Sequence, residues 1–274
     1  MHGINISVDY AYLWRLPCAC YLMLTERQAI EVFHLTFVAQ LGRRVDKALF
    51  AIKGGCNLRF FCRSIRYSED IDFDIRTMAK ATLAGNVDSI LASPAFAQAL
   101  RTKQIEVEHV TSAKQTDTTQ RWKIGIRVAR GPAIPTKVEF SRRRGLDEGH
   151  LLEPVDAELV RTYELFPVLA QHYSREAAFR QKIGALSGRT VTQARDVFDL
   201  KLLLDGGAGR EKLPAAIVKE IPKAIENVMT IGFDEFSGQV RAYLTADYQE
   251  YYGSRKVWET LQQEVVDVLE GLQR

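Results

Sequence analysis

Two neighbouring stretches, KGGCNLR at residues 53–59 and RYSEDIDFD at residues 66–74, carry most of the information in this chain. In the second stretch, carboxylates alternate with apolar residues, as in a β-strand with one buried face. Alternate side chains of a strand point to the same side, so Asp70 and Asp72 converge. Like charges in this position repel each other unless a cation lies between them, and Mg²⁺ prefers carboxylate oxygens. The pattern predicts a metal site at Asp70 and Asp72, whereas we expect Asp74 to lie at the surface.

The paired glycines Gly54 and Gly55 fall where an apolar strand ends and a short helix is expected to begin. A glycine turn that opens a helix presents backbone amides and the positive end of the helix dipole, both of which suit phosphate. A glycine pair alone marks many turns, but this pair comes one short helix before the acids. Together the two stretches indicate a metal-dependent site for a nucleoside triphosphate.

Four other residues are candidates on weaker patterns. The Ser68 hydroxyl would lie near the acids if the alternation extends to it, although a turn or cap is an equal alternative. Lys53 and Arg59 would contact phosphate or face solvent. Glu139 lies on an expected strand, and it becomes a third metal-site acid if that strand lies beside residues 71–75.

Composition excludes several classes of protein. The 274 residues are 46% hydrophobic and 26% charged, which is typical of a soluble globular chain. A net charge of +3 implies no strong overall field, so any basic surface must be local. Zinc-ligand spacing is absent from the four cysteines, which are Cys18, Cys20, Cys56 and Cys62, and we expect a reduced, cytoplasmic protein. No stretch is long and apolar enough to span a bilayer, so no membrane partner is expected.

Three regions are expected along the chain. Residues 1–24 form an N-terminal extension, because the first clean helix start is the capping-box pattern of Thr25 with Gln28. Residues 25–154 mix strand-like and helical segments, which predicts a mixed sheet in an α/β (α+β) domain. Residues 155–274 have helical patterns almost throughout and predict a helical C-terminal domain.

The expected strands cover residues 49–53, 71–75, 104–110, 122–128 and 136–140. The expected helices cover residues 25–41, 79–100, 174–186, 193–204, 213–229, 234–244 and 257–272. The helix over residues 79–100 is weakened by Gly85 and Pro94.

Further charged residues have two interpretations each. Arg142, Arg143 and Arg144 follow a strand and are either a solvated loop or a contact for a nucleic-acid backbone. Lys182 on its own is a surface lysine. Asp196 and Asp199 are three residues apart and share a helix face, which is ordinarily a polar face or a salt-bridged one.

Taken in order, these segments resemble the AbiEii/AbiGii toxin family of nucleotidyltransferases, which includes the mycobacterial MenT toxins. The resemblance is carried by residues 53–59, 66–73, 137–141, 182–189 and 195–200. It implies a fold like the DNA polymerase β-type nucleotidyltransferases, with a mixed sheet and a helical C-terminal half that completes the cleft. It also implies a toxin of a bacterial toxin–antitoxin or abortive-infection pair, and therefore a cognate antitoxin as partner.

The resemblance also implies roles for particular residues. Gly54, Gly55 and Ser68 would hold the triphosphate, and Asp70 with Asp72 would bind Mg²⁺ or Mn²⁺. Lys182 would neutralise phosphate charge, Asp196 in preference to Asp199 would complete the site, and Arg66 is a further candidate. Cys56 and Asn57 stand where threonine and alanine are usual in the family, which leaves the turn intact but removes a hydroxyl.

The expected reaction is attack by an RNA 3′-hydroxyl, with the tRNA 3′ end as the favoured acceptor, on the α-phosphate of a nucleoside triphosphate. One alternative is a phosphohydrolase that uses Asp70 and Asp72 as nucleophile and acid. Another is a catalytically idle module that binds nucleotide or an antitoxin in the same cleft.

Overall fold

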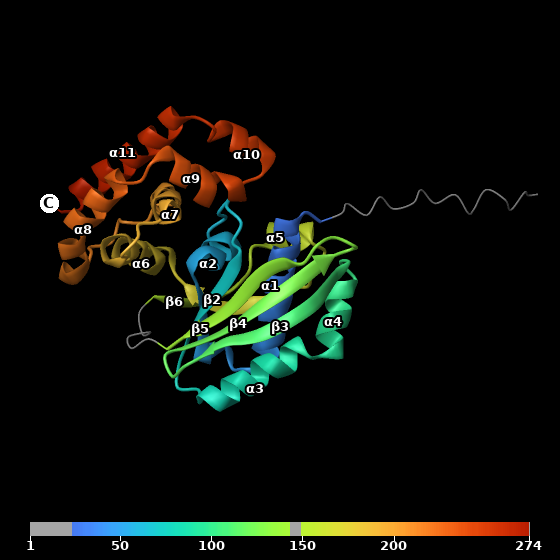
Figure 1. Ribbon diagram of the computed structural model, residues 1–274. Helices are drawn as coiled ribbons and strands as arrows, with labels where there is room; N and C mark the ends of the chain where they lie inside the picture. The colour runs from blue at the N-terminus through green and yellow to red at the C-terminus, as the bar shows by residue number, and fades with distance from the viewer. Residues whose placement is uncertain (1–23, 143–148, 274) are drawn as a thin grey trace, which may run out of the picture.

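The computed structural model describes residues 24–142 and 149–273, and a seven-stranded mixed sheet forms its centre (Figure 1). The strand order across the sheet is β3-β4-β5-β2-β1-β7-β6. The strands are β1 (Phe50–Lys53), β2 (Asp70–Ile75), β3 (Ile105–Gln115), β4 (Thr119–Val128), β5 (Ile134–Ser141), β6 (His150–Pro154) and β7 (Leu169–Tyr173). The mixed sheet expected of an α/β (α+β) protein is confirmed.

Helix α1 (Glu26–Arg44) packs on one face of this sheet. It begins at the predicted capping box, where the Thr25 hydroxyl accepts from the Gln28 amide and the Gln28 carbonyl oxygen accepts from the Thr25 amide at 2.9 Å. Phe33 and Phe37 of α1 are fully buried, and the Phe37 ring centroid lies 6.2 Å from that of Phe73 in β2. The apolar residues of β2 thus face α1. Because side chains alternate along a strand, Asp70 and Asp72 of β2 point to the opposite side of the sheet.

The strand–helix–strand unit at the centre of the sheet has the order that the sequence predicts. A short 3₁₀ turn, η2 (Lys47–Leu49), leads into β1, and α2 (Gly54–Phe61) follows β1 directly. Strand β2 pairs antiparallel with β1, which sets Lys53 opposite Asp72, and parallel with β5, which sets Glu139 on the other side of Asp72. Charged residues therefore flank Asp72 on both neighbouring strands.

Residues 79–100 form two helices where the sequence predicts one weakened helix. They are α3 (Lys80–Leu91) and α4 (Pro94–Arg101), and Pro94 takes the first position of α4. Proline has no amide to continue the preceding helix but suits a helix start. The Ser93 hydroxyl caps α4 by accepting from the Phe96 amide.

The expectation of an almost wholly helical chain after residue 154 is wrong for β7. This strand pairs in parallel with β1, and on its other side it pairs antiparallel with β6. A single short helix, α5 (Ala157–Thr162), separates β6 from β7. Strand β7 is only five residues long and contains Gln171 and His172, so it has neither the length nor the apolar alternation that signals a strand.

The helices after β7 gather to one side of the sheet, near α2 (Figure 1). They are α6 (Arg175–Gly188), α7 (Ala194–Asp205), α8 (Ala215–Met229), α9 (Phe233–Gln239), the 3₁₀ turn η3 (Arg241–Tyr243), α10 (Ala246–Tyr251) and α11 (Arg255–Gly271). Four of the five helices expected from residue 174 onward are confirmed, whereas the one expected over residues 234–244 ends at Gln239 and is followed by η3, and α10 was not expected. Their apolar side chains form a core of their own that also takes in Leu58 of α2. The helical half thus packs against the glycine-turn unit.

Some expectations fall outside the described residues. They concern the N-terminal extension up to residue 23, which holds Cys18 and Cys20, together with Arg143 and Arg144. The division into three regions stays a prediction. Within the described ranges, no helix combines the length and the hydropathy needed to cross a membrane.

Phe73 offers a test of how β2 is anchored. Its side chain is fully buried between α1 and the sheet, and its ring lies 4.7 Å from that of Phe140 in β5. Phe73→Ala should lower the free energy of unfolding by about 3–5 kcal/mol through lost contacts and a residual cavity, as measured by urea denaturation. Phe166→Ala is the control, because Phe166 is 87% exposed, and it should change stability by no more than about 0.5 kcal/mol. Equal losses in the two variants would contradict the proposed anchor.

Candidate active site

The glycine turn lies close to β2 and to the residues that precede it, and a side chain at either glycine would crowd them. Gly54 has φ +67°, a conformation that favours glycine, and a Cβ there would lie 3.3 Å from Asp72 Oδ2. A Cβ at Gly55 would lie 2.7 Å from Ser68 Oγ and 3.2 Å from Arg66 Nη2. The missing side chains therefore leave room for Ser68, Arg66 and Asp72 to gather at the start of α2.

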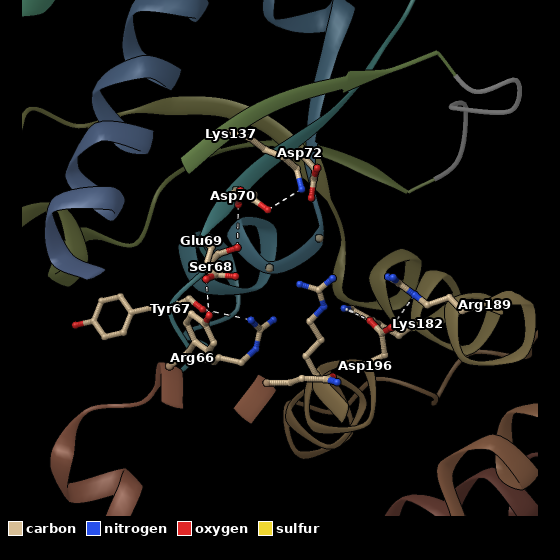
Figure 2. Close-up of a pocket in the computed structure, with 15 residues that line it drawn as sticks. Arg66, Tyr67, Ser68, Glu69, Asp70, Asp72, Lys137, Lys182, Arg189 and Asp196 are labelled. Carbon is tan, nitrogen blue, oxygen red and sulfur yellow. Dashed lines mark hydrogen bonds and ion pairs between the residues drawn. The ribbon is translucent and has the colours of Figure 1, made fainter. Parts of the chain in front are cut away.

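Asp70 and Asp72 line one cavity of about 90 Å³, with Gly54 and Gly55 beside them. Figure 2 shows both carboxylates on the same side of β2, together with Lys137 from the neighbouring strand β5. Lys137 Nζ lies 2.6 Å from Asp70 Oδ2. Burial raises the pKa of Asp72; Lys137 and Lys53 lower it, but not enough to offset the burial. The lysines around Asp72 thus do not fully compensate its buried charge.

The opposite wall of the cavity comes from the helical half (Figure 2). Lys182 of α6 lies between two acids of α7, with Nζ 2.8 Å from Asp196 Oδ1 and 2.6 Å from Asp199 Oδ2. Burial alone lowers the pKa of Lys182, but Asp196 and Asp199 outweigh it, and the net pKa is raised. Lys182 therefore carries a permanent positive charge at neutral pH.

The two acids of α7 take different places. Asp196 lines the cavity, and its Oδ2 lies 2.9 Å from Arg189 Nε without hydrogen-bond geometry. Asp199 lies behind the cavity wall, where it accepts from Arg66 Nη2 at 2.9 Å as well as from Lys182. Burial raises the pKa of Asp199, but Arg66 and Lys182 outweigh it and hold the pKa below its ordinary value. Asp196 is therefore positioned to face a ligand, and Asp199 to orient two cations.

Ser68 and the residues after the glycines support the start of β2. The Ser68 hydroxyl lines the cavity and donates to the Asp70 carbonyl at 2.9 Å. Cys56 Sγ lies 3.3 Å from the same carbonyl oxygen, and Asn57 donates to the Tyr173 carbonyl at 3.0 Å. Both Cys56 and Asn57 are buried, so their side chains hold the backbone and do not line the cavity.

Two residues predicted to contact phosphate, Arg59 and Lys53, form ion pairs with carboxylates instead. Arg59 donates to Glu31 and to the Ser64 carbonyl and does not line the cavity, because burial of Glu31 in α1 requires a cation there. Lys53 pairs with Asp74, with 2.5 Å between Nζ and Oδ1. The expectation of a surface Asp74 is wrong, since this carboxylate is buried and also accepts from the Tyr173 hydroxyl at 2.7 Å.

Glu139 lies on the cavity side of the sheet but outside the small cavity. It lines a larger adjoining cleft of about 880 Å³, which also includes Lys53, Gly54 and Asp72. Arg121 Nε holds its carboxylate at 2.5 Å. Among residues 24–142 and 149–273, no three carboxylate, histidine or cysteine side chains are grouped tightly enough to hold a metal ion. The predicted third acid is thus near the pair but engaged by arginine.

The other predicted basic loop is only partly described. Arg142 Nη2 donates to Gln120 Oε1 at 2.6 Å, and the residue lines neither the small cavity nor the cleft. Arg143 and Arg144 lie outside the described residues.

Sequence reasoning gave no role to seven residues that line the small cavity, namely Tyr67, Glu69, Lys137, Arg189, Arg195, Gln239 and Tyr243. Lys137 and Glu139 alternate on one strand, a signal that could have placed the lysine beside Asp70. Tyr243 lies in η3, where it contacts Glu69, and burial followed by this carboxylate raises its pKa to about 12. Nothing local marks Gln239 or Tyr243, because only tertiary packing brings them to the cavity.

Three solved structures share this fold. They are JHP933 from Helicobacter pylori (18% identity, TM-score 0.60, covering 92% of this chain and 93% of that chain), a putative nucleotidyltransferase from H. pylori (21%, 0.58, 92% and 100%), and the nucleotidyltransferase toxin MenT4 from Mycobacterium tuberculosis H37Rv (16%, 0.58, 91% and 87%). A comparison with curated proteins finds no match. The expected nucleotidyltransferase toxin fold is therefore confirmed.

The family model for the nucleotidyl transferase AbiEii toxin of type IV toxin–antitoxin systems matches residues 36–260. This range includes the glycine turn, the β2 acids and the α6–α7 cluster. Membership supports nucleotidyl transfer over the phosphohydrolase alternative, and it implies a nucleotide substrate and an antitoxin partner. The chain belongs to the AbiEii family of nucleotidyl transferase toxins.

Proposed function

We propose that this protein transfers a nucleoside monophosphate from a nucleoside triphosphate to the 3′-hydroxyl of an RNA in the cytoplasm, with the tRNA 3′ end as acceptor. One observation carries the proposal: the Asp70 and Asp72 carboxylates face a cavity whose floor is the Gly54–Gly55 turn and whose far wall carries Lys182. Acids, phosphate-binding amides and a fixed cation are the parts that phosphoryl-group transfer requires.

The triphosphate would lie between the glycine turn and the cations of the helical half. Five cationic side chains line the small cavity, namely Arg66, Lys137, Lys182, Arg189 and Arg195, together with four carboxylates, Glu69, Asp70, Asp72 and Asp196. Arg66 and Lys182 are already held in place by Asp199, so they need little reordering when a ligand binds. Such preorganised charge stabilises the negative charge that develops on the transferring phosphate.

The donor atoms suit Mg²⁺ or Mn²⁺ as cofactor. Asp70 and Asp72 offer hard carboxylate oxygens from one strand face, and the raised pKa of Asp72 shows a carboxylate that a further cation would stabilise. Asp70 and Asp72 would hold the ion, and Glu139 would join them only on release from Arg121. A bound divalent cation would acidify the attacking hydroxyl and offset charge on the departing pyrophosphate.

The residues of this chain would then act by position. The amides at the start of α2 and the Ser68 hydroxyl would orient the phosphates, and the permanent charge of Lys182 would balance them. The acceptor would enter through the adjoining cleft of about 880 Å³, which shares Asp72 and Lys182 with the small cavity. The cleft therefore gives a second substrate access to the same acids.

The direct experiment incubates the protein with each of the four α-labelled nucleoside triphosphates, Mg²⁺ and total tRNA, and follows label on the RNA by gel electrophoresis. Label on RNA from at least one triphosphate supports the proposal. Triphosphate binding without label on any RNA would favour the idle binding module, and label on protein alone would exclude RNA as acceptor.

Asp72→Asn keeps the shape of the side chain and removes its charge. This variant should lower the rate of nucleotide incorporation by about 10²- to 10³-fold, because the proposed divalent cation would lose one of its two carboxylate ligands. Asp267→Asn on the exposed surface of α11 is the matched control and should retain the wild-type rate. Full activity of Asp72→Asn would remove the metal assignment.

The same substitution should stabilise the protein without metal. Burial raises the folded-state pKa of Asp72 above the ordinary value of 3.8, so its ionisation costs folding free energy at neutral pH. This cost fades as pH falls through the folded-state pKa and is gone below 3.8. In EDTA at pH 7, Asp72→Asn should therefore melt at a higher temperature than wild type, and the difference should shrink towards acidic pH. Thermal denaturation by circular dichroism measures both. A variant that melts lower at neutral pH would show that the charge of Asp72 is well compensated.

Arg195 tests the triphosphate site with little risk to the fold. It lines the small cavity, and within the described ranges no carboxylate forms an ion pair with it. Arg195→Gln should raise the KM for the triphosphate about tenfold or more, since one charge-assisted hydrogen bond is lost. Arg101→Gln on the exposed surface of α4 should leave the KM unchanged. Equal KM values for wild type and Arg195→Gln would place the phosphates elsewhere.

A further inference from the structure

One face of strands β3, β4 and β5 is open. Trp122 and Ile124 of β4 are buried in the core with α1, so the alternate residues Arg121 and Lys123 point to the other side. In Figure 1 these three strands lie in front of α1, with no helix between them and the viewer. This is also the side of the sheet to which Asp70 and Asp72 point.

The register connects this open face to the acids. Asp70 of β2 lies opposite Lys137 of β5, which in turn lies opposite Lys123 of β4, and Lys123 lies opposite Thr111 of β3. Neighbouring strands are ~4.8 Å apart, so the backbone of Lys123 is roughly 10 Å from that of Asp70. A chain that leaves the acids over the sheet therefore meets Lys123 first beyond Lys137.

An exposed ring lies on the same face. His109 of β3 is exposed and pairs with Gly125 of β4, and a Cβ at Gly125 would lie 2.1 Å from His109 Cε1. The imidazole therefore lies against the Gly125 backbone. A glycine inside a strand commonly marks such a close approach. The ring is exposed, and Lys123 and Arg127 flank Gly125 two residues away along β4 on the same face.

Basic residues outnumber acids on this face, where Glu106 lies opposite Arg127. Arg121 pairs with Glu139 and Arg127 with Glu108, whereas Lys123 and Lys114 are exposed and pair with no carboxylate of the described chain. The one large apolar side chain exposed on these strands, Val110, lies opposite Ile124 and so belongs to the other face. Free cations beside a ring, without exposed aliphatic groups, suit a polynucleotide better than a protein surface.

We infer that the open face of β3, β4 and β5 binds the single-stranded 3′ segment of the RNA acceptor, with one base stacked on His109 and a backbone phosphate at Lys123. The inference rests on the proposed function, since that function brings an RNA 3′-hydroxyl to Asp70 and Asp72. Sheet faces that combine aromatic rings with basic residues bind single strands in this way, because bases stack on the rings while phosphates meet the cations. The nucleotides upstream of the reacting end would follow the row from Lys137 to Lys123.

Direct binding tests this surface separately from catalysis. The probe is a fluorescein-labelled 12-nucleotide single-stranded RNA, and its anisotropy is measured in EDTA without triphosphate, so that no transfer occurs. His109→Ala should weaken binding about tenfold, whereas His109→Tyr, which keeps a ring, should bind within about twofold of wild type. Lys123→Gln should weaken binding and reduce the slope of log K against log salt by about 0.7.

Two control variants match these changes on surfaces away from the sheet face. Phe166→Ala removes an exposed ring from the segment before β7, and Lys256→Gln removes an exposed charge from α11. Neither should alter the binding constant or the salt slope. Melting temperatures of all variants separate lost binding from lost structure, because His109 also covers Gly125.

The outcomes are distinct. If His109→Ala lowers only the melting temperature and Lys123→Gln leaves the salt slope unchanged, the face does not bind RNA and the inference is wrong. If these variants lose the antitoxin but keep the RNA, the face is a protein-docking surface, which also overturns it. Wild-type binding that these variants weaken, without nucleotide incorporation, would uphold this surface and refute the proposed function instead.

Discussion

Buried negative charge on β2 is the constraint on which the site depends. Three carboxylates alternate along this strand, and neighbouring strands supply a lysine to two of them, Lys137 to Asp70 and Lys53 to Asp74. Within residues 24–142 and 149–273 Asp72 forms no such ion pair, and burial raises its pKa. Close like charges can be held together only where each repulsion is compensated. The neighbouring strands therefore compensate the outer acids of β2, and the charge of the central one is the charge that the proposed divalent cation would compensate.

Compensation of buried negative charge also joins the sheet to the helical half of the molecule. The Asp199 carboxylate, buried in α7, accepts from Arg66 before β2 and from Lys182 in α6. Removing one member of such a buried cluster leaves an unpaired charge, so the cluster is costly to open. Leu58 of α2 adds an apolar contact to the helical core. The distance across the cavity is thus set by charges that a ligand does not need to rearrange.

Local pattern was sufficient for the glycine turn, the β2 acids and most helices, because strand alternation, capping and glycine conformation act over a few residues. It failed where partners are distant. Nothing in the local sequence shows that Arg59 and Lys53 form ion pairs with Glu31 of α1 and Asp74 of β2. Strand β7 has no apolar pattern that would identify it in the sequence. Its place in the sheet is set by pairing with β1. Cavity residues such as Tyr243 depend in the same way on long-range packing.

The balance of charge in the cavity also explains how the protein without a ligand keeps many charged side chains close together. The five cations and four carboxylates of the cavity nearly cancel, so the cavity keeps its form without a ligand. In the proposed reaction, a triphosphate that arrives with a divalent cation would exchange lysine–aspartate pairs for cation–aspartate and lysine–phosphate pairs. Lys137 is the natural group to move, because its partner Asp70 is partly exposed and the pair is accessible to solvent. Binding of this kind would redistribute charge within a wall that Asp199 keeps in place, and the proposed cation would relieve the energetic cost of the buried Asp72.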